Sequence, residues 1–373
     1  CRENEMIICK EKILIYGLSL VLISCGSADR DNGTLGKVKG IYSTNSAFAA
    51  LKNDGTVVTW GYSPTGADSS NVMLENVKTI YSNGNAFAAL KNDGTVVTWG
   101  LADLGGDSSN VVLENIKTIY STGSAFAALN NEGAVVTWGD SRFGGDSTKV
   151  VLEDVENLYS NHYAFAALKN NGALVTWGST DRGGDSFNVI SEDIKTIYST
   201  YDAFAALKND GTVVTWGNLY HGGDSSSVIP ENVKIIYSTK SAFAALQNDG
   251  AVVTWGDYGG DSSSVMLTNV KATYSNFYDF AALQNDGSVV TWGEYYYQCD
   301  SSKVELENVK IIFSNNHAFA ALKDDNTVVT WGACDEGGDS SRVTLENVKT
   351  ITSSANAFAA LKNDGTVVTW GRS

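Results

Sequence analysis

Three histidines are the side chains in this sequence best suited to acid–base or metal chemistry near neutral pH. His162, His221 and His317 lie far apart, and none shares the short spacing of a metal motif with another. A hydrolytic site would also need a nucleophile, a base and an orienting group in one asymmetric set. Ser and Asp are abundant, but they recur at equivalent positions along the chain. The sequence therefore predicts no catalytic residue, no metal site and no cofactor.

One aspartate recurs in turns of the Gly-Gly-Asp-Ser-Ser type. Its copies are Asp68, Asp107, Asp146, Asp185, Asp224, Asp261, Asp300 and Asp339. Stacked Asp-rich turns bind calcium in some β-solenoids, which makes calcium a conceivable ligand. Each turn offers a single carboxylate, however, whereas calcium takes about six to eight oxygen ligands. Because Asp and Ser also stabilise turns through their own backbone bonds, we expect these residues to be structural.

These turns belong to a repeat that organises most of the chain. All nine tryptophans occupy one repeat position, with spacings of 39 residues except for one spacing of 37. They are Trp60, Trp99, Trp138, Trp177, Trp216, Trp255, Trp292, Trp331 and Trp370. A phenylalanine precedes each tryptophan by twelve residues, from Phe48 to Phe358. Self-similarity at such a period is the signature of a stacked-repeat architecture.

Each unit reads as three strands. In the second unit, β-branched and aromatic residues predict strands at 77–82 and 95–99, with an Ala-rich strand at 86–91 between them. Propensity alone would make the Ala-rich segment helical. It is too short for a helix, and the Asn-Asp-Gly turn at 92–94 predicts a hairpin, so its small residues indicate close sheet packing. A short outer strand or an irregular connector completes the unit.

The run VKTIYS…AFAALKNDGTVVTWG resembles the repeat of the regulator-of-chromosome-condensation family, and its short period is most similar to the family's secreted bacterial β-lactamase inhibitors. The resemblance covers residues 37–373. It implies an all-β propeller of nine short blades, each with three or four strands. The sequence departs from the family pattern in two ways. Gly-Gly-Asp-Ser-Ser replaces the family's Gly-Gln-Leu-Gly, and no long insertion resembles the wedge by which the family engages its GTPase. Nucleotide exchange is therefore not implied.

Ring closure is left open by the sequence. The repeats begin with a first strand at Val38 and end with a third strand at Trp370. Nothing in residues 26–36 resembles the missing outer segment of the last blade. A β-solenoid or an open arc therefore remains an alternative to a closed ring.

The N-terminal residues predict export. Residues 1–5 look like upstream read-through, and residues 1–24 as a whole read as a signal peptide with basic residues before an apolar run at 13–23. The segment from Leu22 to Cys25 resembles a bacterial lipobox, which implies lipidation of Cys25 and anchoring to a membrane. Residues 25–36 are a polar tether. We expect a lipoprotein at the outer membrane or cell surface.

The net charge of the chain limits the classes of partner that it can bind. The formal net charge is −16, so an acidic surface would repel phosphate backbones and nucleic acid is not an expected partner.

Of the five cysteines, only Cys299 and Cys334 lie in the repeats. A disulfide between them is compatible with export. Cysteines at non-equivalent loop positions are more often unpaired, which we take as the expectation.

Variation between the units concentrates after the first strand and after the Trp-Gly pair. In an up-and-down sheet both segments lie at one end, so a uniform scaffold would carry one diversified face. Aromatic residues gather there in units four to seven, and Tyr is favoured in interfaces. The predicted partner-binding residues are Tyr163, Tyr201, Tyr220, His221, Tyr258, Phe277, Tyr278, Tyr295, Tyr296 and Tyr297.

These observations favour a membrane-anchored surface protein that binds a protein or glycan through its aromatic loops. One alternative is a structural surface-layer or adhesin protein in which the number of repeats matters and the loops do not. Another is a hydrolase that uses a central cavity. Neutral drift of exposed loops would also produce variation, although a continuous run of aromatics across four units is less expected from drift.

Overall fold

The computed structural model describes residues 37–186, 192–228, 230–293 and 301–372. The predicted signal peptide, Cys25 and the tether lie outside the described residues. So do Tyr295, Tyr296, Tyr297 and Cys299. Within the described chain, no helix has the length and apolar character needed to cross a bilayer.

Each repeat forms one antiparallel sheet of three strands in chain order, which gives nine sheets. The first strands are β1 Val38–Ser43, β4 Val77–Ser82, β7 Ile116–Ser121, β10 Val155–Ser160, β13 Ile194–Ser199, β16 Val233–Ser238, β19 Val270–Ser275, β22 Val309–Ser314 and β25 Val348–Ser353. The second strands are β2 Ala47–Lys52, β5 Ala86–Lys91, β8 Ala125–Asn130, β11 Ala164–Lys169, β14 Ala203–Lys208, β17 Ala242–Gln247, β20 Asp279–Gln284, β23 Ala318–Lys323 and β26 Ala357–Lys362.

The third strands are β3 Val57–Gly61, β6 Val96–Gly100, β9 Val135–Gly139, β12 Leu174–Gly178, β15 Val213–Gly217, β18 Val252–Gly256, β21 Val289–Gly293, β24 Val328–Gly332 and β27 Val367–Gly371. Short helical turns follow most third strands. They are η1 Ser63–Thr65, η2 Ala102–Leu104, η3 Ser141–Phe143, η4 Thr180–Arg182, η5 Leu219–Gly223, η6 Ser301–Lys303 and η7 Cys334–Glu336. The connector that follows contains no strand among the described residues, so the irregular alternative is the one that forms.

The Ala-rich segments are strands, as the hairpin signal predicts. In β5, Phe87 pairs with Trp99 of β6, and their rings stack with centroids 5.0 Å apart. The turn between these strands holds Gly94 at φ +84°, a conformation that glycine adopts without steric cost. The Asp93 carboxylate closes the turn by accepting a hydrogen bond from the Thr95 backbone N–H at 2.9 Å.

The core lies between successive sheets. Residues of β5 alternate, so that Phe87 and Ala89 pack on the preceding sheet while Ala86, Ala88 and Leu90 pack on the following one. Methyl side chains let the sheets approach closely, which explains why alanine occupies this strand. Trp99 crosses the same interface, and its indole Nε1 donates to the Gly66 carbonyl of the preceding unit at 2.9 Å.

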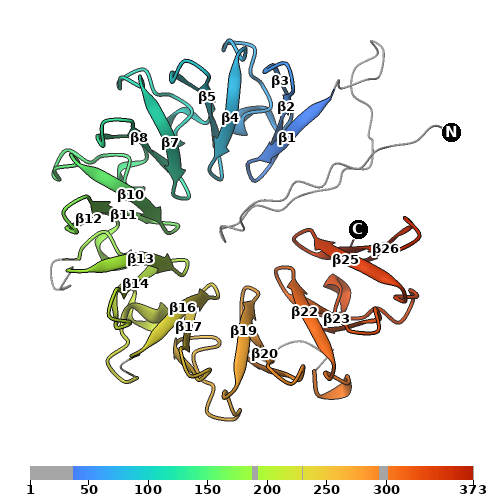
Figure 1. Ribbon diagram of the computed structural model, residues 1–373. Coiled ribbons are helices and arrows are strands. Elements are labelled where there is room, and N and C mark those ends of the chain that lie inside the picture. The colour runs from blue at the N-terminus through green and yellow to red at the C-terminus, as the bar shows by residue number, and fades with distance from the viewer. Residues whose placement is uncertain (1–36, 187–191, 229, 294–300, 373) are drawn as a thin grey trace.

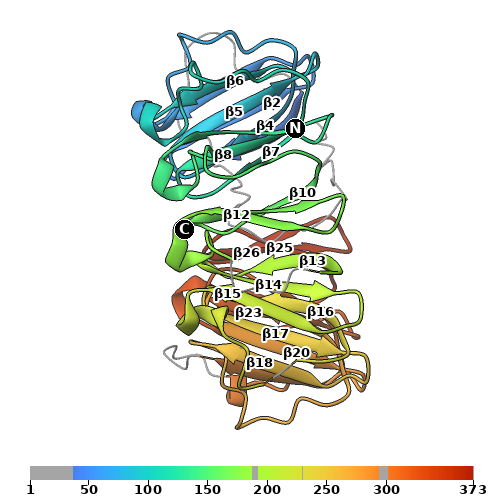
Figure 2. The same ribbon diagram turned by 90° about the vertical axis from the view of Figure 1, so that its left-hand side faces the viewer.

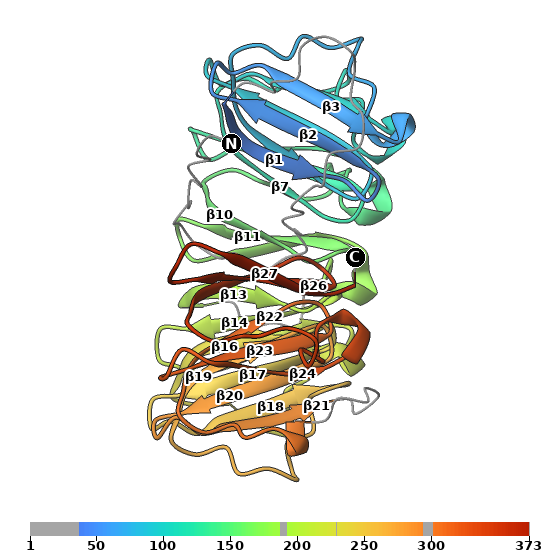
Figure 3. The ribbon, with the colours of Figure 1, turned by 90° about the vertical axis from the view of Figure 1, so that its right-hand side faces the viewer.

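The sheets follow one another around a ring (Figure 1), as expected for a nine-bladed β-propeller with three strands in each blade. The first strands of neighbouring blades are tied by serine hydroxyls, as where Ser160 Oγ donates to the Ser121 carbonyl at 2.8 Å. Seen edge-on, the strands cross the thickness of the ring, and the short helical turns lie along one edge, at the left in Figure 2 and at the right in Figure 3.

The two terminal blades differ from the seven between them. Apolar clusters join each blade to the next along the chain, from the first to the ninth. On the first blade, Ile41 is 40% exposed, whereas its equivalent Ile80 is 2% exposed. On the opposite face of the ninth blade, Val367 is 50% exposed. Among the described residues, these two faces therefore lack the packing that joins the other neighbouring blades.

Cys334 corrects one expectation from the sequence. It is disulfide-bonded, whereas the non-equivalent positions of the repeat cysteines favoured free thiols. Its partner lies outside the described residues.

Candidate functional site

The edge that carries the helical turns is called the loop rim, and the edge with the Asn-Asp-Gly-type turns is called the turn rim. Antiparallel order places both variable segments of each unit at the loop rim, as predicted. A backbone bond joins them directly in the second unit, where Leu101 N–H donates to the Asn85 carbonyl at 3.1 Å. Both segments of one unit therefore act as a single structural element.

Backbone hydrogen bonds also link the loop rim from blade to blade. In most units the central residue of the loop after the first strand donates its N–H to the carbonyl of the equivalent residue one blade later. His162 N–H donates to Tyr201 at 3.0 Å, and Tyr201 N–H donates to Lys240 at 2.9 Å. The same bond runs from Asn45 to Gly84, from Gly123 to His162, and onward from Lys240 through Phe277 and Asn316 to Ala355. We call this set the rim ladder.

Side chains stack along part of the rim ladder. The His162 and Tyr201 rings are nearly parallel, 14° apart in orientation with centroids separated by 4.3 Å. The Lys240 ammonium lies 5.0 Å from the centre of the Tyr201 ring. On the other side, His162 lies so close to Gly123 that a Cβ there would meet imidazole atoms at 2.3 Å. The faces of both rings are therefore occupied by neighbours from adjacent blades.

Tyr163 is enclosed in a similar way. Its ring stacks on Phe143 with centroids 5.2 Å apart, and the Arg182 guanidinium carbon lies 3.9 Å from its centre. Tyr163 also meets Tyr201 edge-on at 5.4 Å. Cation–π contacts of this kind hold charged side chains that would otherwise move freely in solvent.

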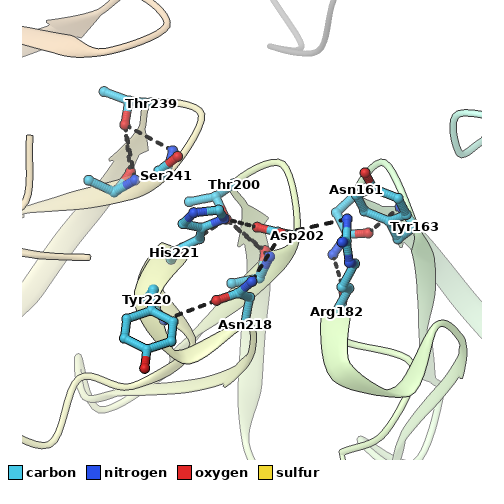
Figure 4. A network of polar contacts seen from close by, with 12 residues as sticks. Asn161, Tyr163, Arg182, Thr200, Asp202, Asn218, Tyr220, His221, Thr239 and Ser241 are labelled. Carbon is cyan, nitrogen blue, oxygen red and sulfur yellow. Dashed lines mark hydrogen bonds and ion pairs between the residues drawn. The ribbon is translucent and has the colours of Figure 1, made fainter. Parts of the chain in front are cut away.

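Asp202 is the buried polar centre of this region (Figure 4), with its side chain only 4% exposed. One oxygen lies 2.6 Å from His221 Nδ1, and the other accepts from Asn218 Nδ2 at 3.2 Å. Arg182 of the preceding unit lies 4.0 Å away. Such partners offset the cost of removing a carboxylate from water. Tyr220, next in the chain to His221, turns its ring away from this network.

Two ionisable groups report the local environment. Burial lowers the pKa of His162, and the nearby charges of Arg182 and Lys240 lower it further. Burial raises the pKa of Tyr201 to about 12, with contributions from Tyr163. The centre of the cluster is thus partly desolvated, and the positive charges of Arg182 and Lys240 act on His162 while the Asp202 carboxylate helps to raise the pKa of Tyr201.

A second cluster lies at the seventh and eighth blades. Tyr278 and His317 stack with centroids 5.7 Å apart, and Phe277 meets His317 edge-on at 5.6 Å. His317 Nδ1 pairs with the Glu336 carboxylate, which also lies 3.8 Å from the Arg372 guanidinium. Here one imidazole both stacks on a tyrosine and pairs with a carboxylate, whereas His162 stacks and His221 pairs in the first cluster.

The predicted partner-binding residues divide by environment. Tyr163, Tyr201 and Tyr278 are partly buried in the two clusters, and His221 is held by Asp202. Tyr220, Tyr258 and Phe277 project more, with exposures of 78%, 45% and 39%. Tyr220 and Tyr258 contact no other aromatic ring in the described part of the chain. Among the described residues, the aromatic run is therefore two clusters with separate projecting rings, rather than a continuous platform.

Sequence reasoning missed several members of these clusters. Phe143, Arg182, Asp202, Lys240 and Glu336 were not among the predicted residues. A signal was present, because Asp202 occupies a loop position where most other units have Ser, Asn, Tyr or His. Its pairing with His221 depends on a contact across 19 residues that no motif describes.

The described residues contain no candidate metal site, since no three His, Cys, Asp or Glu side chains are grouped so that they could hold an ion. The carboxylates in the clusters instead pair with imidazole, amide and guanidinium groups. The arrangement can hold a rim in one shape and present rings and cations to a partner.

Comparison with known proteins gives structural similarities only. No family model and no curated protein matches the chain. The receptor kinase CR4 ectodomain of Physcomitrella patens is 15% identical with a TM-score of 0.41, and the match covers 68% of this chain and 71% of that one. The CRINKLY WD40 ectodomain of the Arabidopsis thaliana receptor kinase ACR4 is 16% identical with a TM-score of 0.38, covering 73% and 99%.

A third similar structure is that of Kap60 bound to yeast RCC1 (Prp20). It is 16% identical with a TM-score of 0.38, and the match covers 80% of each chain. The fold itself follows from the strand pairing and blade packing of this chain.

Proposed function

We propose that this chain is a binding protein that captures a protein partner through its loop rim. The observation that carries the proposal is the pairing of a fixed rim with projecting aromatic side chains. Tyr220 is 78% exposed and Tyr258 is 45% exposed, next to loops that are tied by the rim ladder. Large aromatic side chains that enter pockets on a partner supply much of the binding energy in protein interfaces.

Preorganisation supports the same proposal. Ordering loops on binding costs free energy, and loops already held in place avoid that cost. The rim ladder and the stacked rings fix the backbone and several side chains before any partner arrives. A rigid paratope with exposed tyrosines is the arrangement that matured antibodies also use.

A protein partner fits better than a glycan. Sugars bind aromatic side chains by laying an apolar face on an open ring face. Both faces of Tyr201 are covered, by His162 and Lys240, and both faces of Tyr163 are covered, by Phe143 and Arg182. What these rings offer to solvent is their edges, their hydroxyls and the cations beside them. Such groups suit the mixed polar and apolar surface of a protein.

Membrane anchoring is part of the proposal and rests on the N-terminal sequence. Lipidation of Cys25 after removal of residues 1–24 would hold the propeller at the outer membrane or cell surface, where partners are met. Growth of an expressing bacterium with radiolabelled palmitate tests this directly. We expect label in the natural chain and none in Cys25→Ser, and label retained by Cys25→Ser would remove the anchor from the proposal.

The binding proposal is tested by partner capture with matched variants. Membrane and secreted proteins are passed over immobilised natural chain, over Tyr220→Ser/Tyr258→Ser, and over Met73→Ser/Met266→Ser. The methionines are the control, because they are also well exposed, at 69% and 75%, but lie in connectors rather than in the loops. We expect a protein retained by the natural chain and the control, and lost with the tyrosine variant.

Other outcomes redirect the assignment. Equal retention by all three proteins would show that the loop rim does not bind and would favour the structural surface-layer alternative. Retention of a free oligosaccharide, with no protein retained, would favour a glycan ligand. Because unfolding could mimic a loss of binding, the melting temperatures of the three proteins should agree within about 2 °C.

A further inference from the structure

The exposed apolar face of the first blade lacks the cover that every later blade has. Leu74, in the connector before the second blade, is buried against Val77, Ile80, Phe87 and Trp99. The equivalent face of the first blade consists of Val38, Ile41, Phe48 and Trp60. Ile41 is 40% exposed there, twenty times more than Ile80. A face built for a connector therefore stands uncovered in the described chain.

The connectors share a register that can be read from their first strands. An aspartate stands nine residues before each first strand from the second to the ninth, as Asp68 does before Val77. A leucine stands three residues before most of them, as Leu74 does. The aspartate closes a turn, since Asp68 Oδ1 accepts from the Ser70 N–H at 3.0 Å, and the leucine fills the interface.

The chain before the first blade has the same register, contrary to the expectation that nothing in residues 26–36 resembles such a segment. Asp29 stands nine residues before Val38, and Leu35 stands three residues before it. Ala28 and Asn32 match Ala67 and Asn71 of the first connector in type and position. The correspondence begins at Ala28, because Ser27 occupies the place of Gly66, which has φ +110° and no room for a Cβ beside Phe87.

The described residues that enter the first blade support this register. Asn53 N–H donates to the Lys37 carbonyl at 2.9 Å, just as Asn92 N–H donates to the Asn76 carbonyl at 3.0 Å. Asn76 is the last residue of the first connector. The backbone at Lys37 is therefore already placed as the end of a connector.

From these observations we infer that residues 28–36 form a further connector, which covers the apolar face of the first blade with Leu35 in the place of Leu74. The polar tether is then limited to residues 25–27. If Cys25 carries a lipid, only two residues separate the anchor from the folded domain. The first blade is then held close to the membrane, without a flexible linker between the anchor and the domain.

Thiol labelling tests the cover in the full-length chain. Ile41→Cys is alkylated with iodoacetamide, and the rate is read by mass spectrometry from the peptide that contains residue 41. We expect labelling at least about tenfold slower than at Met73→Cys, because a buried thiol reacts only when its cover opens. Adding Leu35→Asp should restore the fast rate.

A matched control is Thr34→Asp, which adds the same charge one residue earlier. Thr34 corresponds to Met73, which is 69% exposed, so this change should leave Ile41→Cys protected. Ile80→Cys with and without Leu74→Asp gives the benchmark for a known connector.

Three results would overturn the inference. Fast labelling of Ile41→Cys without any change at Leu35 would mean that the face is open. Slow labelling that Leu35→Asp does not relieve, and that is independent of protein concentration, would mean that the ninth blade covers the face by itself. Residues 357–371 of the ninth blade are identical to residues 47–61, which pack on the second blade, so the ninth blade could pack on the first blade in the same way. Protection that increases with protein concentration would identify a second copy of the chain as the cover.

Discussion

Replacing Trp216 with alanine should destabilise the propeller strongly. This tryptophan is 5% exposed, stacks on Phe204 with centroids 5.2 Å apart, and donates to the Gly183 carbonyl of the preceding unit at 3.1 Å. Burial of about 200 Å² of indole is worth about 5 kcal/mol, of which alanine retains a small part. Loss of the hydrogen bond adds about 1 kcal/mol, and partial relaxation of the cavity offsets some of the total. We expect a cost of about 3–5 kcal/mol.

Urea unfolding followed by circular dichroism measures this cost, with Trp216→Phe and Tyr220→Ala as controls. Trp216→Phe keeps a ring against Phe204 and should cost about 1–2 kcal/mol. Tyr220→Ala removes an aromatic ring that is 78% exposed and should change stability by less than about 0.5 kcal/mol. A Trp216→Ala cost below about 1 kcal/mol would mean that the indole does not bridge two blades, and the packing scheme would fail. A lowered m-value would show that the blades no longer unfold together.

Other predictions concern the loop rim and the connectors. Because burial raises the pKa of Tyr201 to about 12, the folded state favours the protonated phenol, and its contribution to stability is lost as pH rises from about 10 through about 12. Burial also raises the pKa of Tyr120, Tyr198, Tyr237 and Tyr274, so ultraviolet titration should show a late-ionising group of tyrosines, and Tyr201→Phe should make that late step smaller. Lys240→Gln should raise the pKa of His162 in an NMR titration, because the lysine charge helps to lower it, and an unchanged value would place Lys240 away from the ring. Gly105→Ala should cost about 2–4 kcal/mol in thermal unfolding, because Gly105 has φ +105° and an added Cβ would meet the Phe126 ring at 2.6 Å. At Gly172 an added Cβ would have no neighbour within 4 Å, so Gly172→Ala should cost only the backbone strain of its φ of +81°. Equal costs at the two glycines would contradict the close approach to Phe126.

The repeat made most of the fold predictable. Period, strand order and the hairpin turn follow from residues that recur in every unit, so each local signal is read nine times over. The Ala-rich strand is the instructive case, because helix propensity was overridden by packing between sheets, where Ala86 and Ala88 face one neighbour and Ala89 the other. The common edge of the variable segments followed from antiparallel order alone.

The detailed chemistry of the rim was not predictable in the same way. The pairing of Asp202 with His221, and of His317 with Glu336, depends on one residue in one unit meeting another in a different segment. Repetition gives no help with such single contacts. The enclosure of Tyr163 and Tyr201 was also missed, since a tyrosine in a loop looks equally exposed in sequence whether or not an arginine or lysine covers its ring.

The rim ladder has a consequence for how this protein can change. Its hydrogen bonds use only peptide groups, and the central positions hold residues as different as Gly123, His162, Lys240 and Phe277. Substitution at these sites therefore leaves the bonding that shapes the rim intact. Gly123 is an exception, because His162 leaves no room for a Cβ there. The other positions in the rim ladder can diversify without loss of this bonding, which makes the edge a natural library of side chains and a practical framework on which new specificities could be selected.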